Sequence, residues 1–156
     1  MISYRKATIE DISALIALRI ALLKAVMWIE QAPVDISSQL AAYYEQHIPD
    51  GRYISWVAVE NNTIVSANGI FFYDFPPNFV TTAGQRAYIL NVYTLPEYRR
   101  QGIAKVLFGR LMEELDARGI KQASLHTSPD GMDMYADFGF KPKGNEMVWG
   151  QHIWVF

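Results

Sequence analysis

The sequence predicts an α/β sandwich built on a mixed, mostly antiparallel central sheet. β-rich runs alternate along the chain with segments whose apolar residues recur at helical spacing. In order, the chain reads as a strand, two helices, a β meander, a helix, a strand, a helix and a last β pair. This order predicts about six to seven strands flanked by about four helices.

Length and composition fit one domain that spans residues 1–156. Of the 156 residues, 51% are hydrophobic and 13% are aromatic, which is enough for a sizeable core. No internal repeat, low-complexity segment or long linker divides the chain. A net charge of −2 argues against a protein that binds nucleic acid through its overall charge.

Composition also excludes or disfavours several kinds of site and location. The absence of cysteine excludes disulfides, thiolate catalysis and cysteine-based metal sites, and it fits a cytoplasmic protein. The three histidines are far apart and show no short ligand spacing, so no metal site is predicted. No segment reaches the roughly 18 apolar residues of a membrane span, and the first residues lack the apolar core of a signal peptide. We therefore expect no metal and no membrane.

The N-terminal part of the chain predicts a strand and two helices. Ser3–Ala7 alternates like a short strand, and Thr8 can cap the helix that follows, with Asp11 at the capping-box position. Pro33 breaks this helix, and Ile36–His47 reads as the second one. The first helix presents an apolar face made of Ile12, Leu15, Ile16, Leu18, Leu22 and Leu23.

The middle of the chain predicts the β meander. Tyr53–Glu60 and Thr63–Tyr73 read as strands joined at Asn61-Asn62, because asparagine tolerates the positive φ of a hairpin turn. Gln85–Leu95 is a long β-rich run that ends at Pro96. The remaining elements are a helix closed by Gly119, a strand at Gln122–Thr127, a short helix at Pro129–Asp137, a β segment that starts at Phe140-Lys141-Pro142, and a final strand at Met147–Phe156.

A glycine-containing stretch, Arg99–Ala104 (RRQGIA), lies directly before an amphipathic helix. A helix N-terminus offers unpaired backbone N–H groups and a positive dipole end, so this position suits an anion such as phosphate. The P-loop pattern GxxxxGK[ST] is absent, and only Gly102 is present of the dinucleotide pattern GxGxxG. The stretch satisfies [RQ]-x-x-G-x-[GA] instead. By itself, such a hexapeptide also fits a turn with solvated arginines before an ordinary core helix.

Two motifs, in order and suitably separated, resemble one known family. Val92–Leu111 (VYTLPEYRRQGIAKVLFGRL) resembles the acetyl-CoA-binding core of the GNAT acetyltransferase superfamily. Leu125–Pro142 (LHTSPDGMDMYADFGFKP) is similar to the family's second motif, in which a strand leads to a short helix that carries a tyrosine. Tyr4–Arg19 resembles the family's first strand and helix. The resemblance implies the GNAT fold, in which a bulge splays the fourth strand from the fifth.

The resemblance also implies a site for acetyl-CoA as cosubstrate. The backbone amides of residues 101–104 would cradle its pyrophosphate, and the backbone of Val92 and Thr94 would pair with its pantetheine arm like an added strand. Ser128 stands where the family often has an asparagine that contacts the cosubstrate. The implied cosubstrate-binding residues are Val92, Thr94, Arg99, Arg100, Gln101, Gly102, Ile103, Ala104 and Ser128.

Tyr135 is the candidate catalytic residue, because the family's tyrosine lies near the thioester sulfur. A phenol with a pKa of about 10 can protonate a leaving thiolate, whose thiol has a pKa of about 8.5, if the two are within hydrogen-bond reach. The other interpretation is a helix tyrosine whose ring packs on the core and whose hydroxyl reaches the surface.

The group that takes the proton from the attacking amine is not identified by the sequence. Family members often use a glutamate in the strand before the glycine motif, and Gln85–Leu95 contains no acid. Tyr88, Asn91 and Tyr93 could order a water molecule there. His126, on the next strand, is a more distant candidate because imidazole titrates near neutral pH, and solvent is also open.

The acceptor pocket is expected between the first two helices, the Phe71–Phe79 loop and the last strands. The loop is rich in aromatic residues, which fit either a wall of the pocket or a plain anchor on the core. Asp74 is a candidate carboxylate for binding an amine. The candidate acceptor-binding residues are Trp28, Glu30, Tyr73, Asp74 and Asn91.

The sequence therefore favours an N-acetyltransferase that moves an acetyl group from acetyl-CoA to a primary amine of a small molecule or peptide by direct attack. A non-catalytic acyl-CoA-binding sensor or regulatory module is the alternative, because the strand acid is missing. A nucleotide-binding α/β domain is disfavoured by the single glycine. The resemblance also suggests a homodimer, because many members of the family are dimers.

Overall fold

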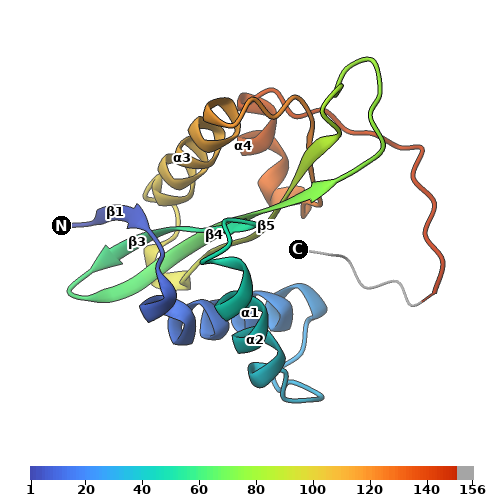
Figure 1. Cartoon of the computed structure of the whole chain (residues 1–156). Helices are drawn as coiled ribbons and strands as arrows, with labels where there is room; N and C mark the ends of the chain where they lie inside the picture. The colour runs from blue at the N-terminus through green and yellow to red at the C-terminus, as the bar shows by residue number, and fades with distance from the viewer. Residues whose placement is uncertain (151–156) are drawn as a thin grey trace.

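The computed structural model describes residues 1–150, and Figure 1 shows how its elements are arranged. Residues 151–156 lie outside the described part of the chain. The strands and α-helices are β1 (Ser3–Lys6), α1 (Ile12–Met27), α2 (Ser37–His47), β2 (Tyr53–Ile54), β3 (Trp56–Glu60), β4 (Thr63–Asp74), β5 (Gln85–Thr94), α3 (Ile103–Ala117), β6 (Ala123–Leu125) and α4 (Met132–Asp137). The predicted order of elements is confirmed up to α4.

A six-stranded sheet forms the centre of the protein, with the order β1-β3-β4-β5-β6 and with β2 paired to β4. The β5–β6 pair is parallel and every other pair is antiparallel, which confirms a mixed, mostly antiparallel sheet. The predicted strand Tyr53–Glu60 is divided at Ser55 into β2 and β3. Asn61 and Asn62 have φ values of 49° and 61°, as the predicted hairpin turn requires.

Helices cover both faces of the sheet (Figure 1). On the α3/α4 face, Phe108 and Leu111 of α3 and Tyr135 of α4 pack on Ile70 and Ile89 of the sheet. On the α1/α2 face, a second core is formed by Leu15, Leu18, Tyr44, Tyr53, Val57 and Ala67. Within residues 1–150, no helix is both long enough and apolar enough to span a bilayer.

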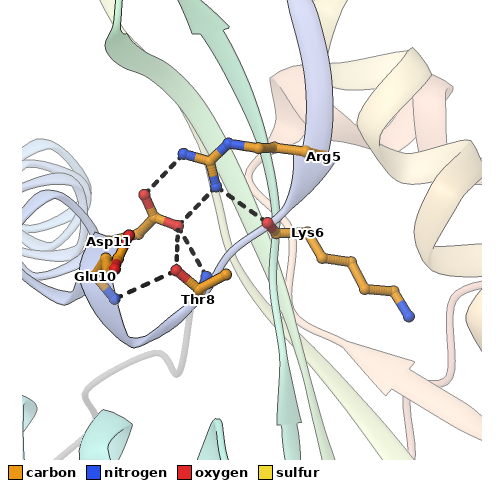
Figure 2. A network of polar contacts seen from close by, with 5 residues as sticks. All are labelled: Arg5, Lys6, Thr8, Glu10 and Asp11. Carbon is orange, nitrogen blue, oxygen red and sulfur yellow. Dashed lines mark hydrogen bonds and ion pairs between the residues drawn. The ribbon is translucent and has the colours of Figure 1, made fainter.

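A polar network fixes the start of α1, as Figure 2 shows. The Thr8 hydroxyl accepts a hydrogen bond from the Glu10 N–H at 3.3 Å, and the Thr8 N–H donates to the Asp11 carboxylate at 2.8 Å. Arg5 donates to both Asp11 oxygens, at 2.7 and 2.9 Å. These contacts lower the pKa of Asp11, chiefly through the hydrogen bond from Arg5. The capping box predicted from Thr8 and Asp11 is therefore confirmed.

The predicted final β pair is wrong for the residues that the structure describes. Residues 140–149 contain no strand, although the Phe140 ring packs against Phe108 and Tyr135. A strand needs a neighbour for its N–H and C=O groups, and β6 pairs only with β5 in the described chain. Pro142 also lacks an N–H group to donate to a ladder. The rest of the predicted Met147–Phe156 strand lies outside the described residues.

Candidate functional site

A bulge in β5 is the feature from which the candidate site is built. The register with β4 runs from Gly69↔Leu90 to Ala67↔Tyr93, so three steps along β5 face two along β4. Asn91 is the extra residue, and its φ of 60° is left-handed. Leu90 packs in the core of the α1/α2 face, and the Asn91 side chain points to the same face. Two consecutive side chains on one face are the mark of a bulge, as the family resemblance implies for this strand.

β5 and β6 separate just before the bulge, after Ile89. They pair at Ala87↔Ala123, Tyr88↔Ser124 and Ile89↔Leu125, and no later pair forms between them in the described chain. An open cleft with about 430 Å³ of empty space begins where the pairing ends. It is lined by Leu22, Val26, Ile89, Leu90, Asn91, Val92, Leu125, His126, Thr127, Ser128 and Tyr135. β5 and β6 correspond to the fourth and fifth predicted strands, Gln85–Leu95 and Gln122–Thr127, so the predicted separation of these two strands is present.

The side chain of Asn91 holds the bulge in place from the α1/α2 face. Its amide nitrogen donates to the hydroxyls of Tyr53 at 2.7 Å and Tyr44 at 3.1 Å. Arg19 of α1 donates to its amide oxygen at 2.7 Å. Asn91 is only 7% exposed, so these partners satisfy a polar group that burial would otherwise penalise. Burial also raises the pKa of Tyr44 and Tyr53, so both hydroxyls stay protonated.

The glycine stretch follows β5 and ends at the start of α3. Arg100 and Gly102 have φ values of 63° and 80°, and this left-handed turn leads directly into the helix. The first helical bond runs from the Val106 N–H to the Gly102 carbonyl at 3.1 Å, so the amides of Ile103 and Ala104 are not used by the helix. Arg99 donates to the Thr94 carbonyl at 3.0 Å. This geometry can hold an anion at the helix end.

Tyr135 lies on the α3/α4 face and lines the cleft. Its ring packs against Phe108 with ring centroids 5.1 Å apart, and the residue is 8% exposed. Burial raises the pKa of Tyr135 to about 12. Its hydroxyl makes no hydrogen bond to residues 1–150, so the ring packs in the core while the residue also lines the cleft.

The sequence-predicted residues are only partly brought together. Asn91, Val92, Ser128 and Tyr135 line one cleft, and the glycine stretch follows at the end of the same strand. None of the other four acceptor candidates lines this cleft. Trp28 and Glu30 are exposed just beyond α1, Tyr73 is half-buried near the end of β4, and Asp74 faces a separate hollow with Asp50 and Arg118.

A polar cluster on the α1/α2 face was only partly foreseen. The Tyr88 hydroxyl is hydrogen-bonded to Nδ1 of His126, and Nε2 of His126 lies 3.6 Å from the Glu146 carboxylate. Burial raises the pKa of Tyr88 to about 12, with Glu146 adding to the shift. Sequence reasoning considered Tyr88 and His126 separately and missed Glu146, as well as Arg19, which donates to the Asn91 amide oxygen. No local pattern links them, because they come from different elements of the fold.

The family of the chain is shown by comparison with known proteins. Residues 23–140 match the sequence model of the acetyltransferase (GNAT) family. Human N-acetyltransferase 8 is 25% identical over 131 residues, which cover 81% of this chain and 56% of that protein. The chain thus spans little more than half the length of this relative.

Solved structures agree with that family. A predicted acetyltransferase from Clostridium acetobutylicum, solved with acetyl-CoA, is 32% identical; the similarity covers 98% of this chain and 100% of that one, with a TM-score of 0.89. A GCN5-related N-acetyltransferase from Ralstonia eutropha JMP134 is 26% identical, covers 97% and 99% of the two chains, and has a TM-score of 0.82. With its two motifs, its parted strands and these relatives, the chain belongs to the acetyltransferase (GNAT) family.

Proposed function

We propose that this chain transfers an acetyl group from acetyl-CoA to a primary amine of a small molecule or peptide by direct attack. The observation that carries the proposal is the parting of β5 and β6 beyond Ile89, with a glycine turn at the end of β5 and a tyrosine in the cleft. A thioester needs a slot of this kind, because its carbonyl must be reached by the amine from outside the sheet. The acetyl-CoA bound to the Clostridium acetobutylicum relative supports the choice of cosubstrate.

The cosubstrate would lie along the open edge of β5. The N–H groups at the start of α3, from Gln101 to Ala104, would receive its pyrophosphate, and Arg99 and Arg100 would flank it. The backbone of Val92 and Thr94 would pair with the pantetheine arm, which leads the thioester to the cleft. Ser128, at the cleft wall, would contribute a hydroxyl where an asparagine is common in the family.

Tyr135 would assist departure of the sulfur. Its pKa of about 12 makes the phenol a weaker acid than a thiol in water, whose pKa is about 8.5. The same burial disfavours a thiolate, so the leaving sulfur becomes more basic inside the cleft than it is in water. We therefore assign Tyr135 as hydrogen-bond donor to the developing thiolate, with proton transfer completed as the C–S bond breaks.

The acceptor would approach from the α1/α2 face, where Asn91, Tyr73, Trp28 and Glu30 are the candidate contacts. Asp74, the remaining candidate, lies in the separate hollow with Phe72 and Arg118. A primary amine of a small molecule or peptide fits the family. The homodimer and the cytoplasmic location stay predictions.

The test is the release of free thiol from acetyl-CoA in the presence of a panel of amines, read with a thiol reagent. The chain has no cysteine, so its own background is low. We expect release that depends on one class of amine and yields the acetylated amine by mass spectrometry. No release with any amine, combined with tight CoA binding by calorimetry, would point instead to a non-catalytic acyl-CoA-binding module.

A further inference from the structure

Arg86 of β5 is a cation without a counter-ion on the α1/α2 face. Ala87 packs in the core of the α3/α4 face, so Arg86 beside it points to the opposite side of the sheet. Its guanidinium lies over the Phe75 ring, 3.7 Å from the ring centroid. Nε is buried and makes no hydrogen bond, and no carboxylate among residues 1–150 forms an ion pair with this side chain. Stacking and packing, rather than a carboxylate, therefore hold the guanidinium in place.

This arrangement differs from that of the other arginines. Each of them is exposed except Arg19, which donates to the bulge residue of β5. Arg110 also lies over an aromatic ring, that of Trp56, but it forms an ion pair with Glu113. In the described part of the chain, Nε is the one guanidinium nitrogen of Arg86 that is both buried and unbonded, so the two Nη groups reach the surface. A stacked guanidinium keeps the planar pair of donors with which arginine binds a carboxylate.

The carboxylate nearest to this site in the sequence points away from it. Tyr73 is the β4 partner of Arg86, and its ring meets the Phe75 ring edge to face, with centroids 6.5 Å apart. Asp74, between these two aromatic residues, instead faces the hollow that Arg118 lines. The fold thus places a cation on an aromatic surface and directs the adjacent acid elsewhere. An anion from outside the chain can pair with Arg86 without displacing a carboxylate.

The place of Arg86 in β5 sets how far this anion lies from the cleft. Arg86, Tyr88 and Leu90 follow one another on the α1/α2 face, and Leu90 lines the cleft. Four residues of strand cover about 13 Å. The guanidinium leans further from the cleft, towards Phe75, whose N–H donates to the Gly84 carbonyl. An extended peptide needs about four residues for this span, because each residue covers about 3.3–3.6 Å.

We propose that the acceptor is an extended, peptide-like amine that carries a carboxylate, and that Arg86 binds this carboxylate. The inference rests on the acetyl transfer proposed above and names the acceptor class of that site. With the α-amine of a peptide in the cleft, the side chain of an acidic residue near the fourth position reaches Arg86. Two parallel N–H···O bonds can join the guanidinium to the carboxylate. Arg86 thus selects the acceptor and takes no part in the bond changes.

The test measures kcat/KM for lysine-free peptides in which one glutamate is moved from the second to the sixth position. Each peptide is compared with its glutamine counterpart. For the wild type we expect the glutamate peptide to be preferred by about tenfold or more, with the largest ratio near the fourth position, because a hydrogen bond to a charged group is strong enough for that ratio. Arg86→Gln should lose the preference and treat both peptides as the wild type treats the glutamine peptide. The matched control is Arg110→Gln, which removes another arginine from an aromatic ring and should keep the preference.

Each ratio is measured within one variant, so a change in the stability of that variant does not affect it. Arg86→Lys keeps the charge without the planar pair of donors and should keep only part of the preference. Arg86→Glu should prefer a peptide with arginine near the fourth position.

Three results would overturn this assignment alone: no preference in the wild type, an equal preference in Arg86→Gln, or an Arg86-dependent preference confined to single amino acids. A wild type that binds CoA and acetylates no amine would overturn the proposed function, and this inference with it.

Discussion

The two faces of the cleft are specified in different ways. On the α3/α4 face, the candidate groups come from two contiguous stretches, the glycine turn at residues 99–104 and the segment at residues 128–135. On the α1/α2 face, Arg19, Asn91 and His126 come from a helix, a bulge and the end of another strand. The face proposed to bind the cosubstrate is thus encoded by local sequence, whereas the face proposed to bind the acceptor depends on tertiary contacts between distant segments.

The largest expected effect tests the single side chain on which the cosubstrate face depends. Tyr135→Phe keeps the ring that packs on Phe108 and removes only the hydroxyl, so kcat should fall by about 10²- to 10⁴-fold. CoA affinity by calorimetry and stability in urea should not change. Tyr4→Phe on the edge strand β1 is the matched control. Equal kcat in Tyr135→Phe and Tyr4→Phe would remove Tyr135 from the chemistry.

The next effect tests the shared support of the acceptor face. Asn91→Ala leaves the Tyr44 and Tyr53 hydroxyls without their amide partner, so the free energy of unfolding should drop by about 2–3 kcal/mol. Urea unfolding followed by fluorescence measures this change. Asn91→Gly, which accepts a positive φ freely, should recover part of the loss and thereby separates backbone strain from lost hydrogen bonds. A drop of less than about 0.5 kcal/mol in Asn91→Ala would show that the hydrogen bonds of the Asn91 side chain are not needed for stability.

A smaller effect is expected at the glycine turn, where backbone conformation matters more than any side chain. Gly102 has a φ of 80°, so Gly102→Val should cost about 1–2 kcal/mol in left-handed strain. A Cβ at this position meets no protein atom within 4 Å, so a loss of CoA affinity beyond the effect of strain must come from contact between the side chain and the ligand. We expect CoA affinity by calorimetry to fall about tenfold or more, as 1.4 kcal/mol implies. Gly109→Ala, inside α3 and equally open, is the control and should leave affinity unchanged; similar affinities in the two variants would argue against phosphate binding at the turn.

The smallest effect should come from a position remote from both faces. Thr8→Ala removes the cap of the turn that starts α1, so the free energy of unfolding should fall by about 1 kcal/mol. Thermal unfolding measures the loss, and kcat should stay at the wild-type value. A marked loss of kcat would mean that the capping network positions α1 over the cleft, which would join the N-terminal region to the acceptor face.

Much of the fold could be predicted, and the cosubstrate site could be proposed, because the signals are local. The capping box at Thr8 and the Asn61-Asn62 turn follow from side chains that bond or bend their own backbone. The bulge was expected only from the family resemblance, and its place at Asn91 was not. Asparagine is uncommon within strands, so its presence in QRAYILNVYT was a usable signal. What holds it, however, are Arg19, Tyr44 and Tyr53, which no local pattern connects.

The incorrect final β pair also shows that the sequence does not reveal contacts between distant segments. Met147, Val148 and Trp149 have strand-forming character, yet they form no strand and are exposed. A strand needs a neighbouring strand to pair with its backbone N–H and C=O groups, and the composition of one segment does not show whether that neighbour exists. Sequence alone predicts the residues of a site even less well than it predicts strands. Glu146, for example, is an exposed residue that attracts attention only because the fold places the His126 imidazole beside it.

The single left-handed residue in β5 also changes the phase of the strand. Before it, the odd-numbered residues Ala87 and Ile89 face α3; after it, the even-numbered Val92 does. If Asn91 were deleted, all the remaining side chains of this strand would therefore keep their present faces, and both cores would stay intact. The strand would then continue without a bulge. In this architecture a single inserted residue produces the bulge, and the same fold without that residue would have a regular strand in its place.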